Sequence, residues 1–306
     1  MKKKFSIVIP VYKNELNLPI TIPYVIDNLT LFDNYDIELV LVNDGSPDNS
    51  IEIIREYKKK YQELIKVISL SKNFGQAAAI RCGFDVSTGD VIGVISADLQ
   101  DPFELFVEML KEWENGYKIV IATRSQRNEK NISIVFSRIF HKIVKKFVNK
   151  DYPDGGFDFF VIDKSIKEEY SQIDLVPAFP QLLLLSLGHK RKFIEYTREE
   201  RKKGKSAWTL QAKIDLAIGV LVYFSDFPLK IVLFGGCILL ISSSIFIIVD
   251  ILLLVTKILN FNIIIDIGAM LLFFISIILI ALGIVGEYIY YNFKISKKYP
   301  AYIIEE

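Results

Sequence analysis

The amino-acid sequence predicts an α/β domain built on a doubly wound, mostly parallel sheet, followed by amphipathic helices and a hairpin of two transmembrane helices. Three observations support this prediction. Short runs rich in Val and Ile alternate with helix-length segments in the N-terminal part of the chain. The 306 residues are 51% hydrophobic although 24% of them are charged. Both values fit one chain only if the apolar residues are concentrated in one region, and they are concentrated after residue 228.

Five short runs are predicted to be strands of one sheet. They cover residues 5–12, 37–43, 66–70, 91–96 and 118–123, with helices predicted between them, for example at 51–61 and 103–115. In such sheets, ligands bind at the carboxyl ends of the strands. Polar residues gather at three of these ends, at 12–15, 43–46 and 98–101. The sequence therefore predicts a binding site at this edge of the sheet.

Two residues after the fourth predicted strand are candidate metal ligands. Asp98 and Gln100 are two positions apart, and in an extended segment both side chains would point to the same side. Their oxygen atoms suit Mg²⁺ or Mn²⁺, which use substrate phosphates to complete their coordination. With only two histidines in the chain, a His-rich metal site is excluded. Asp44, after the second predicted strand, is on its own equally consistent with capping the next helix.

Amphipathic and basic segments follow the predicted sheet. Residues 131–150 place apolar side chains on one helical face, which fits a helix packed on the core or a helix at a membrane surface. Residues 190–205 are strongly basic, and 208–224 are again amphipathic. A basic run before such a helix is typical of a collar beside a membrane span.

Two runs without charged residues, 231–249 and 267–286, predict the membrane hairpin. At a rise of about 1.5 Å per residue, each can cross a hydrocarbon core of about 30 Å. Their tandem arrangement favours spans at about 231–255 and 265–289 over buried core helices. Lysines follow the second span, at Lys294, Lys297 and Lys298, so both termini are expected in the cytoplasm.

The predicted organisation has four parts. A cytoplasmic domain at 1–206 precedes an interfacial helix at 207–228, the hairpin at 229–292 and a cytoplasmic tail at 293–306. The chain is thus expected to be an integral protein of the inner membrane, without a signal peptide. A net charge of +1 gives no general attraction to nucleic acid. Cys82 and Cys237 lie in very different surroundings, so no disulfide is expected.

Six short motifs resemble those of one enzyme family. They are PVYKNELNL at 10–18, VNDGSPD at 42–48, SLSKNFGQ at 69–76, SADLQDP at 96–102, ATR at 122–124 and RKKGKS at 201–206. Together they resemble family 2 glycosyltransferases with the GT-A fold. The closer likeness is to polyprenyl-phosphate glycosyltransferases, which include dolichol-phosphate mannose synthases and bacterial undecaprenyl-phosphate sugar transferases. The likeness extends to the paired spans.

The resemblance implies roles for individual residues. The nucleotide sugar would be contacted by Pro10, Tyr12, Asn14, Glu15, Asp44 and Asp98. A Mg²⁺ or Mn²⁺ ion would be held by Asp98 and Gln100. The acceptor phosphate would be received by Arg124, Ser137, Arg138, Arg201 and Lys205. Asp158 would lie near the acceptor as a base or orienting group, so the candidate catalytic residues are Asp98, Asp158 and Arg124.

The sequence departs from the family pattern at two places. Ser96 stands where the family usually has an acidic residue, which implies that one metal ligand is missing or replaced by water. Lys13 and Asn14 stand where the family has Asn-Glu after the tyrosine, and Glu15 follows one position later. Both departures concern the expected donor site.

The predicted reaction is inverting transfer of a sugar from a UDP- or GDP-linked donor to a polyprenyl phosphate, such as undecaprenyl phosphate, at the cytoplasmic membrane face. A phosphate monoester is ionised at neutral pH and needs no strong base to attack. Transfer to a saccharide or glycolipid hydroxyl is the alternative, and it would require Asp158 or Asp101 as the base. A catalytically inactive membrane scaffold is a third interpretation. The sequence is compatible with a homo-oligomer.

Overall fold

The computed structural model forms two compact units along the chain. It describes residues 2–124, 140–146, 148–154, 156–173, 179–197, 217–221, 224–225 and 300–305, with single residues and short groups between 267 and 292. The first unit comprises Met1–Ala217 and Tyr299–Glu306, and the second comprises Ile218–Lys298. The last residues of the chain therefore belong to the same unit as the N-terminal domain.

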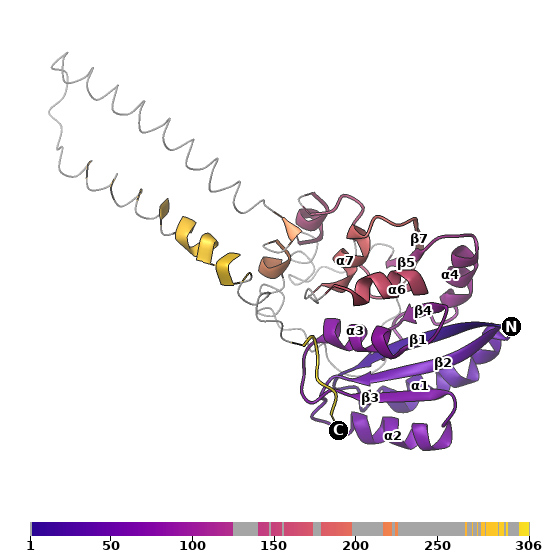
Figure 1. Ribbon diagram of the computed structural model, residues 1–306. Helices are drawn as coiled ribbons and strands as arrows, with labels where there is room; N and C mark the ends of the chain where they lie inside the picture. Colours follow the sequence, from indigo (N-terminus) through magenta and orange to yellow (C-terminus); the bar gives the residue numbers. More distant parts are fainter. Residues whose placement is uncertain are drawn as a thin grey trace, which may run out of the picture. The chain divides into compact units, whose positions relative to one another are not determined.

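A seven-stranded sheet forms the centre of the first unit (Figure 1). Its strands are β1 (Lys3–Val11), β2 (Tyr35–Asn43), β3 (Ile65–Ser69), β4 (Val91–Val94), β5 (Ile119–Arg124), β6 (Phe160–Asp163) and β7 (Arg191–Tyr196). Their order is β3-β2-β1-β4-β6-β5-β7, and only β6 runs antiparallel to its neighbours. The predicted mostly parallel sheet is confirmed, and the five predicted strands match β1 to β5 within a few residues at each end.

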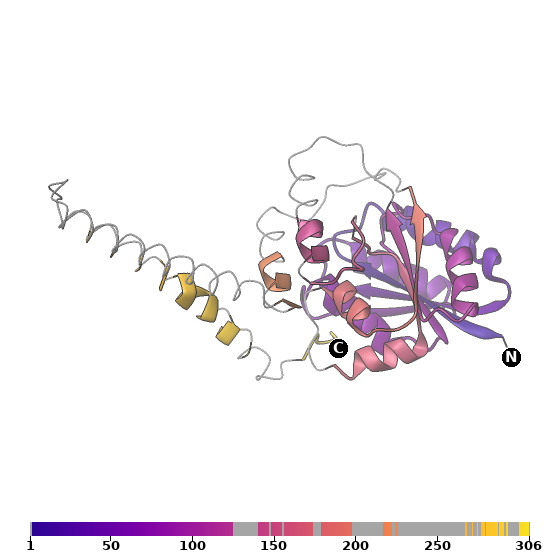
Figure 2. The same ribbon diagram turned by 90° about the horizontal axis from the view of Figure 1, so that it is seen from above.

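Helices cover both faces of the sheet (Figure 2). They are α1 (Leu18–Asp27), η1 (Leu29–Phe32), α2 (Ser50–Lys60), α3 (Gln76–Val86), α4 (Leu105–Glu114), α6 (Lys164–Ser171) and α7 (Pro180–Ser186). Phe5, Ile7 and Ile9 of β1 point into a core shared with α1, α2 and α4. Val8 points to the opposite face, where a Cβ on Gly83 of α3 would lie 2.3 Å from Val8 Cγ1. Helix α6 packs against α3 on that second face.

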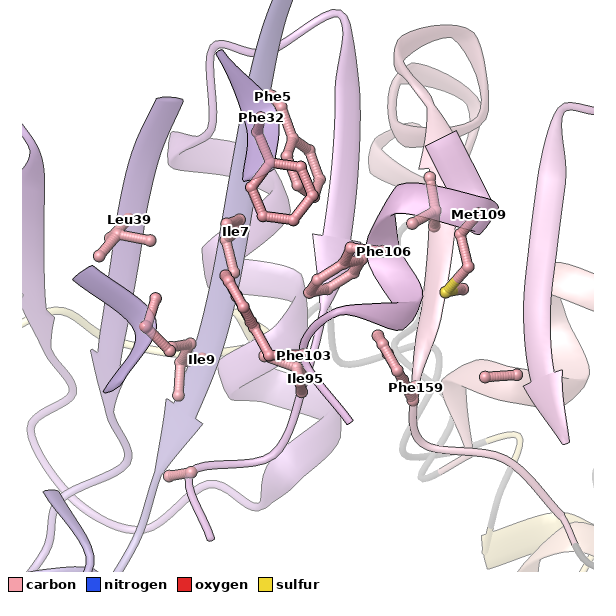
Figure 3. Close-up of a cluster of buried hydrophobic side chains, with 14 of the residues drawn as sticks. Phe5, Ile7, Ile9, Phe32, Leu39, Ile95, Phe103, Phe106, Met109 and Phe159 are labelled. Atoms are coloured by element: carbon pink, nitrogen blue, oxygen red, sulfur yellow. The ribbon is translucent and has the colours of Figure 1, made fainter. Parts of the chain in front are cut away.

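Aromatic rings fill the core between β1 and α4 (Figure 3). The Phe106 ring lies edge-on to Phe5 at 5.2 Å, to Phe103 at 5.7 Å and to Phe159 at 4.7 Å between ring centroids. Gly93 in β4 makes room for this packing, because a Cβ there would lie 2.5 Å from Phe106 Cε1. The glycine inside a buried strand is therefore explained by the ring that covers it.

Three predictions concern segments that the structure describes only in part. Residues 140–146, from the predicted helix at 131–150, are helical, and residues 125–139 lie outside the described part. The predicted spans lie largely outside it as well. Among the described residues, no helix combines the length and the apolar character needed to cross a membrane.

Candidate active site

The carboxyl edge of the sheet brings together the polar segments that the sequence singled out. β1 lies between β2 and β4, and the strand order reverses direction there, which is where open α/β sheets bind ligands. Pro10, near the end of β1, is paired with Val42 of β2 and is partly exposed. β6 is antiparallel, so the residues that precede it, including Asp158, reach the same edge as the ends of β4 and β5.

The turn after β1 is held by its own polar side chains. Lys13 adopts a left-handed conformation, with φ of 54°. Asn14 Oδ1 accepts a hydrogen bond from Tyr12 N at 3.1 Å, and Glu15 Oε2 accepts one from Asn49 N at 3.1 Å. Asn14 and Glu15 were expected to contact the nucleotide sugar. The structure gives both side chains a role in shaping the turn that presents Tyr12.

Asp44 joins the end of β2 to the start of α3. Its Oδ1 accepts a hydrogen bond from Phe74 N at 2.7 Å and its Oδ2 one from Gly75 N at 3.0 Å. Burial raises the pKa of Asp44 to about 6, although these two hydrogen bonds lower it. Gly45 has φ of 57°, and a Cβ there would lie 2.2 Å from the Lys72 carbonyl carbon. Asp44 therefore does not cap the next helix, α2, whose N-cap residue is Asn49; its carboxylate instead fixes the loop that leads into α3.

The segment after β4 contains two carboxylates that converge on one hydroxyl group. Ser96 Oγ lies 2.8 Å from Asp98 Oδ1 and 2.9 Å from Asp101 Oδ2. Asp98 Oδ1 also accepts a hydrogen bond from Gln100 N at 3.3 Å. The expectation of an extended segment was wrong, because Leu99 has φ of 51° and the chain turns at this point. A left-handed non-glycine residue at a polar edge is typical of a functional site.

A second group of polar residues continues from this cluster. The Tyr196 hydroxyl donates a hydrogen bond to Asp101 Oδ1, and Arg124 is hydrogen-bonded to Tyr196. Arg124 Nη2 donates to Asp158 Oδ2 at 2.7 Å, and Gln181 Nε2 donates to Asp158 Oδ1 at 3.0 Å. Side chains from the ends of β4, β5 and β7, the segment before β6 and helix α7 thus form one continuous network.

The charges in this network support one another. Burial lowers the pKa of the Arg124 guanidinium, but the negative charge of Asp158 and the groups at Tyr196 and Asp101 outweigh that effect and raise it. Burial and the Asp101 carboxylate raise the pKa of Tyr196. Arg124 is thus permanently cationic, and its Nε atom is buried without a hydrogen-bond partner among the described residues.

An aromatic pair lies beside the Arg124–Asp158 ion pair. The rings of His141 and Tyr152 stack with centroids 5.6 Å apart. Burial and the positive charge of Arg124 lower the pKa of His141 to about 4, so its imidazole is neutral at physiological pH. Gly156 has φ of 64°, and a Cβ there would lie 2.8 Å from His141 Cε1. Close packing therefore fixes the chain just before Asp158.

The structure brings some of the predicted site residues together and leaves others outside its description. Asp98, Arg124 and Asp158 lie in the network described above. Four predicted acceptor residues lie outside the described residues, and they are Ser137, Arg138, Arg201 and Lys205.

Tyr196 and Gln181 were missed as site residues, and Asp101 was considered only as an alternative base. The alternation of Ile194, Glu195 and Tyr196 could have indicated the strand that carries Tyr196.

The donor set after β4 suits a hard cation. Asp98, Asp101, Gln100 and Ser96 offer only oxygen atoms, which is the preference of Mg²⁺ and Mn²⁺. Within the part of the chain that the structure describes, no three His, Cys, Asp or Glu side chains are grouped as a metal site. Few protein ligands are typical of a cation that is bound mainly through substrate phosphates.

Comparison with known proteins identifies the family. The model of "Glycosyl transferase family 2" matches residues 6–171. The uncharacterized glycosyltransferase YkcC of Bacillus subtilis (strain 168) is 34% identical over 99% of this chain and 94% of its own length. The prophage bactoprenol glucosyl transferase homolog of Escherichia coli (strain K12) is 30% identical, covering 99% and 98%. The undecaprenyl-phosphate 4-deoxy-4-formamido-L-arabinose transferase of Photorhabdus laumondii is 28% identical, covering 99% and 94%.

A solved structure shares the fold. The crystal structure of a mycobacterial protein superposes with a TM-score of 0.51 at 16% identity, over 72% of this chain and 73% of the other. The mixed, mostly parallel sheet is of the GT-A-like type that the motifs predicted. The family model covers most of the sheet, and the relatives cover nearly the whole chain. The chain therefore belongs to glycosyl transferase family 2.

Proposed function

We propose that this glycosyltransferase transfers a sugar from a UDP- or GDP-linked donor to a polyprenyl phosphate, such as undecaprenyl phosphate, by one inverting displacement at the cytoplasmic membrane face. The observation that carries the proposal is the partly buried Arg124–Asp158 ion pair, which is linked through Tyr196 and Asp101 to the polar cluster after β4. On this proposal, the Arg124 guanidinium lies beside the donor site. It suits an acceptor that is itself an anion.

The names of the relatives support a lipid phosphate as the acceptor. Bactoprenol and undecaprenyl phosphate are named for relatives that match this chain over 98% and 94% of their own lengths. The predicted hairpin at 229–292 and the basic run at 190–205 would hold the domain beside such a lipid. On this proposal, the protein is anchored in the inner membrane with both termini in the cytoplasm.

The donor is proposed to bind at the ends of β1, β2 and β4. Tyr12 is partly exposed on a turn that is fixed by a hydrogen bond within it and by two hydrogen bonds to the segment 46–48, and Pro10 lies beside it. Asp98, with Gln100, would hold Mg²⁺ or Mn²⁺ together with the donor phosphates. When bound, the cation would stabilise the negative charge of the departing nucleoside diphosphate.

Arg124 is proposed to bind and orient the acceptor phosphate. A guanidinium forms charge-assisted hydrogen bonds with phosphate oxygens, and 16% of the Arg124 side chain is exposed. Asp158 accepts hydrogen bonds from both Arg124 and Gln181, so its carboxylate holds the guanidinium in place. This favours an orienting role for Asp158 over that of a general base. An ionised phosphate acceptor needs no such base.

The test is to incubate the purified full-length protein with undecaprenyl phosphate and, separately, with UDP- and GDP-linked sugars in the presence of Mn²⁺. Mass spectrometry of the lipid fraction should show a glycosyl phosphate product with one donor. Transfer to a glycolipid hydroxyl, with none to undecaprenyl phosphate, would overturn the proposed acceptor and favour the alternative reaction. Absence of both transfer and donor hydrolysis would favour an inactive scaffold.

A further inference from the structure

The last residues of the chain pair with the end of β3. Ser71 N donates a hydrogen bond to Ile303 O at 2.9 Å, and Glu305 N donates one to Ser69 O at 2.8 Å. Leu70 and Ile304 form an antiparallel bridge between these two bonds. Figure 1 marks the C-terminus near β3. The segment 302–305 therefore extends the sheet at its open edge.

Two side-chain contacts fix this C-terminal segment further. The Tyr302 hydroxyl donates to Asp85 Oδ2 of α3 at 2.9 Å. Ser69 Oγ donates to Glu305 Oε2 at 2.8 Å. Because one contact is to α3 and the other to the last residue of β3, the segment contacts both elements that flank the loop at 70–75. That loop carries the Phe74 and Gly75 amides that bind Asp44.

A series of hydrogen bonds leads from Glu305 to the turn after β1. Asn43 Nδ2 donates to Ser69 Oγ at 3.0 Å, while Ser46 N donates to Asn43 Oδ1 at 3.3 Å. Lys13 N donates to Ser46 Oγ at 3.2 Å. Ser69 donates to Glu305 and accepts from Asn43, so each group in the series uses a different atom or lone pair. The series crosses the carboxyl ends of β3, β2 and β1.

We propose that the C-terminal segment 302–305 is a positioning element of the nucleotide site, in which Glu305 and Ser69 are positioning residues. This inference rests on the proposed function, because it assumes that the nucleotide binds at the ends of β1 and β2. Glu305 orients the Ser69 hydroxyl, which orients the Asn43 amide against Ser46 and so supports the turn that presents Tyr12. The main-chain pairing holds the other side of the site through the loop that binds Asp44.

The first test measures nucleotide binding by the full-length protein in lipid nanodiscs. UDP and GDP are each titrated with Mn²⁺, and the variants are Glu305→Ala, Glu305→Gln and Ile303→Ala. Glu305→Ala should weaken binding about three- to tenfold, the loss expected when one or two hydrogen bonds no longer support the site. Glu305→Gln keeps an acceptor oxygen for Ser69 and should restore most of the affinity. Ile303→Ala is the matched control, because the main chain of Ile303 makes the contact and its side chain is 51% exposed.

Steady-state kinetics with the active donor separate positioning from general loss of structure. Glu305→Ala should raise the donor KM by the same factor while kcat and the acceptor KM stay unchanged. Equal effects on donor and acceptor, or an effect of Ile303→Ala as large as that of Glu305→Ala, would overturn the inference.

A second test uses no nucleotide. Hydrogen exchange of the Ser46 and Lys13 amides should be about three- to tenfold faster in Glu305→Ala and Ser69→Ala than in the wild type, because both amides donate within the series that begins at Glu305. Ser69→Thr retains the hydroxyl and should behave as the wild type does. Unchanged exchange in both alanine variants would refute the positioning role. If exchange changes but the wild type binds neither UDP nor GDP, the link to the nucleotide and the proposed donor fail together, whereas the contact itself is upheld.

Discussion

Replacing Ser96 with Asp would place a third carboxylate between Asp98 and Asp101. Ser96 Oγ lies 2.8 Å and 2.9 Å from oxygens of these two residues. Two unit charges about 4 Å apart repel by about 4 kcal/mol at an effective dielectric constant of about 20. With two neighbours, the repulsion exceeds the free energy of protonating a carboxyl group at about pH 7.5, which is about 5 kcal/mol for a pKa near 4. Proton uptake therefore limits the destabilisation to about 5 kcal/mol.

The variant should make folding stability depend on a divalent cation. A loss of about 4–5 kcal/mol corresponds to a fall in Tm of roughly 10–20 °C for a domain of this size. Millimolar Mn²⁺ should recover most of it, because the cation replaces repulsion with coordination. The matched control is Ser96→Asn, which has the same shape as Ser96→Asp without the charge. Its Tm should respond to Mn²⁺ no more than that of the wild type.

Thermal unfolding of the full-length variants, in EDTA and in Mn²⁺, measures this effect. The difference between the Asp and Asn variants in EDTA should shrink as pH falls toward 5, since the added carboxyl group then takes up a proton more easily. Equal Tm values for the two variants in EDTA would refute the expected charge repulsion within this cluster. A large difference that Mn²⁺ leaves unchanged would show that these residues do not form a cation site.

Three further predictions follow from the described contacts. Gly93→Ala should lower the unfolding free energy by about 1–3 kcal/mol, because its Cβ would lie 2.5 Å from Phe106; an unchanged Tm would contradict this. Burial raises the pKa of Asp44 to about 6, so protonated Asp44 stabilises the fold below about pH 4, and this stability is lost as pH rises through 6. Between these pH values the wild type should lose about 2–3 kcal/mol of unfolding free energy, seen as a fall in Tm, whereas Asp44→Asn should show no such fall. Arg124→Gln should destabilise the fold by about 1–3 kcal/mol, because it removes the cation from Asp158, whose side chain is 36% exposed, and adding Asp158→Asn should restore stability without restoring transfer; recovered transfer would exclude Arg124 from acceptor binding.

The strands of the parallel part of the sheet could be predicted because their composition is local information. β1, β2 and β4 are buried on both faces, so they are runs of Val, Ile and Leu with little polar interruption. β6 and β7 were missed for different reasons. β6 has four residues, and nothing in so short a run reveals that it is antiparallel. β7 lies in a basic run, and the charges obscured the alternation that buries Ile194 and Tyr196.

The sequence could predict which residues of the candidate site lie near the ends of strands, but not the contacts between them. The sequence indicated Asp98, Arg124 and Asp158, and these do belong to one network. It did not indicate the turn that holds Asp98. Left-handed positions are usually recognised by a glycine or an asparagine, and this one is occupied by Leu99. Contacts such as Glu305 with Ser69 join residues 236 positions apart. Pairings of this kind depend on the folded topology, which the local sequence does not contain.

Ser96 stands where the family pattern has a carboxylate, and its hydroxyl group affects how the two remaining carboxylates, Asp98 and Asp101, are used. The hydroxyl has a single proton for two carboxylates, and the Tyr196 hydroxyl donates to the other oxygen of Asp101. Asp101 thus takes part in the link with Arg124, which leaves Asp98 as the principal acidic ligand of the cation that we propose. One carboxylate binds Mg²⁺ or Mn²⁺ weakly unless phosphate oxygens complete the coordination. On the proposed function, the cation should therefore bind together with the nucleotide sugar, and the hydrogen bonds that occupy Asp101 should also orient Arg124 toward the proposed acceptor.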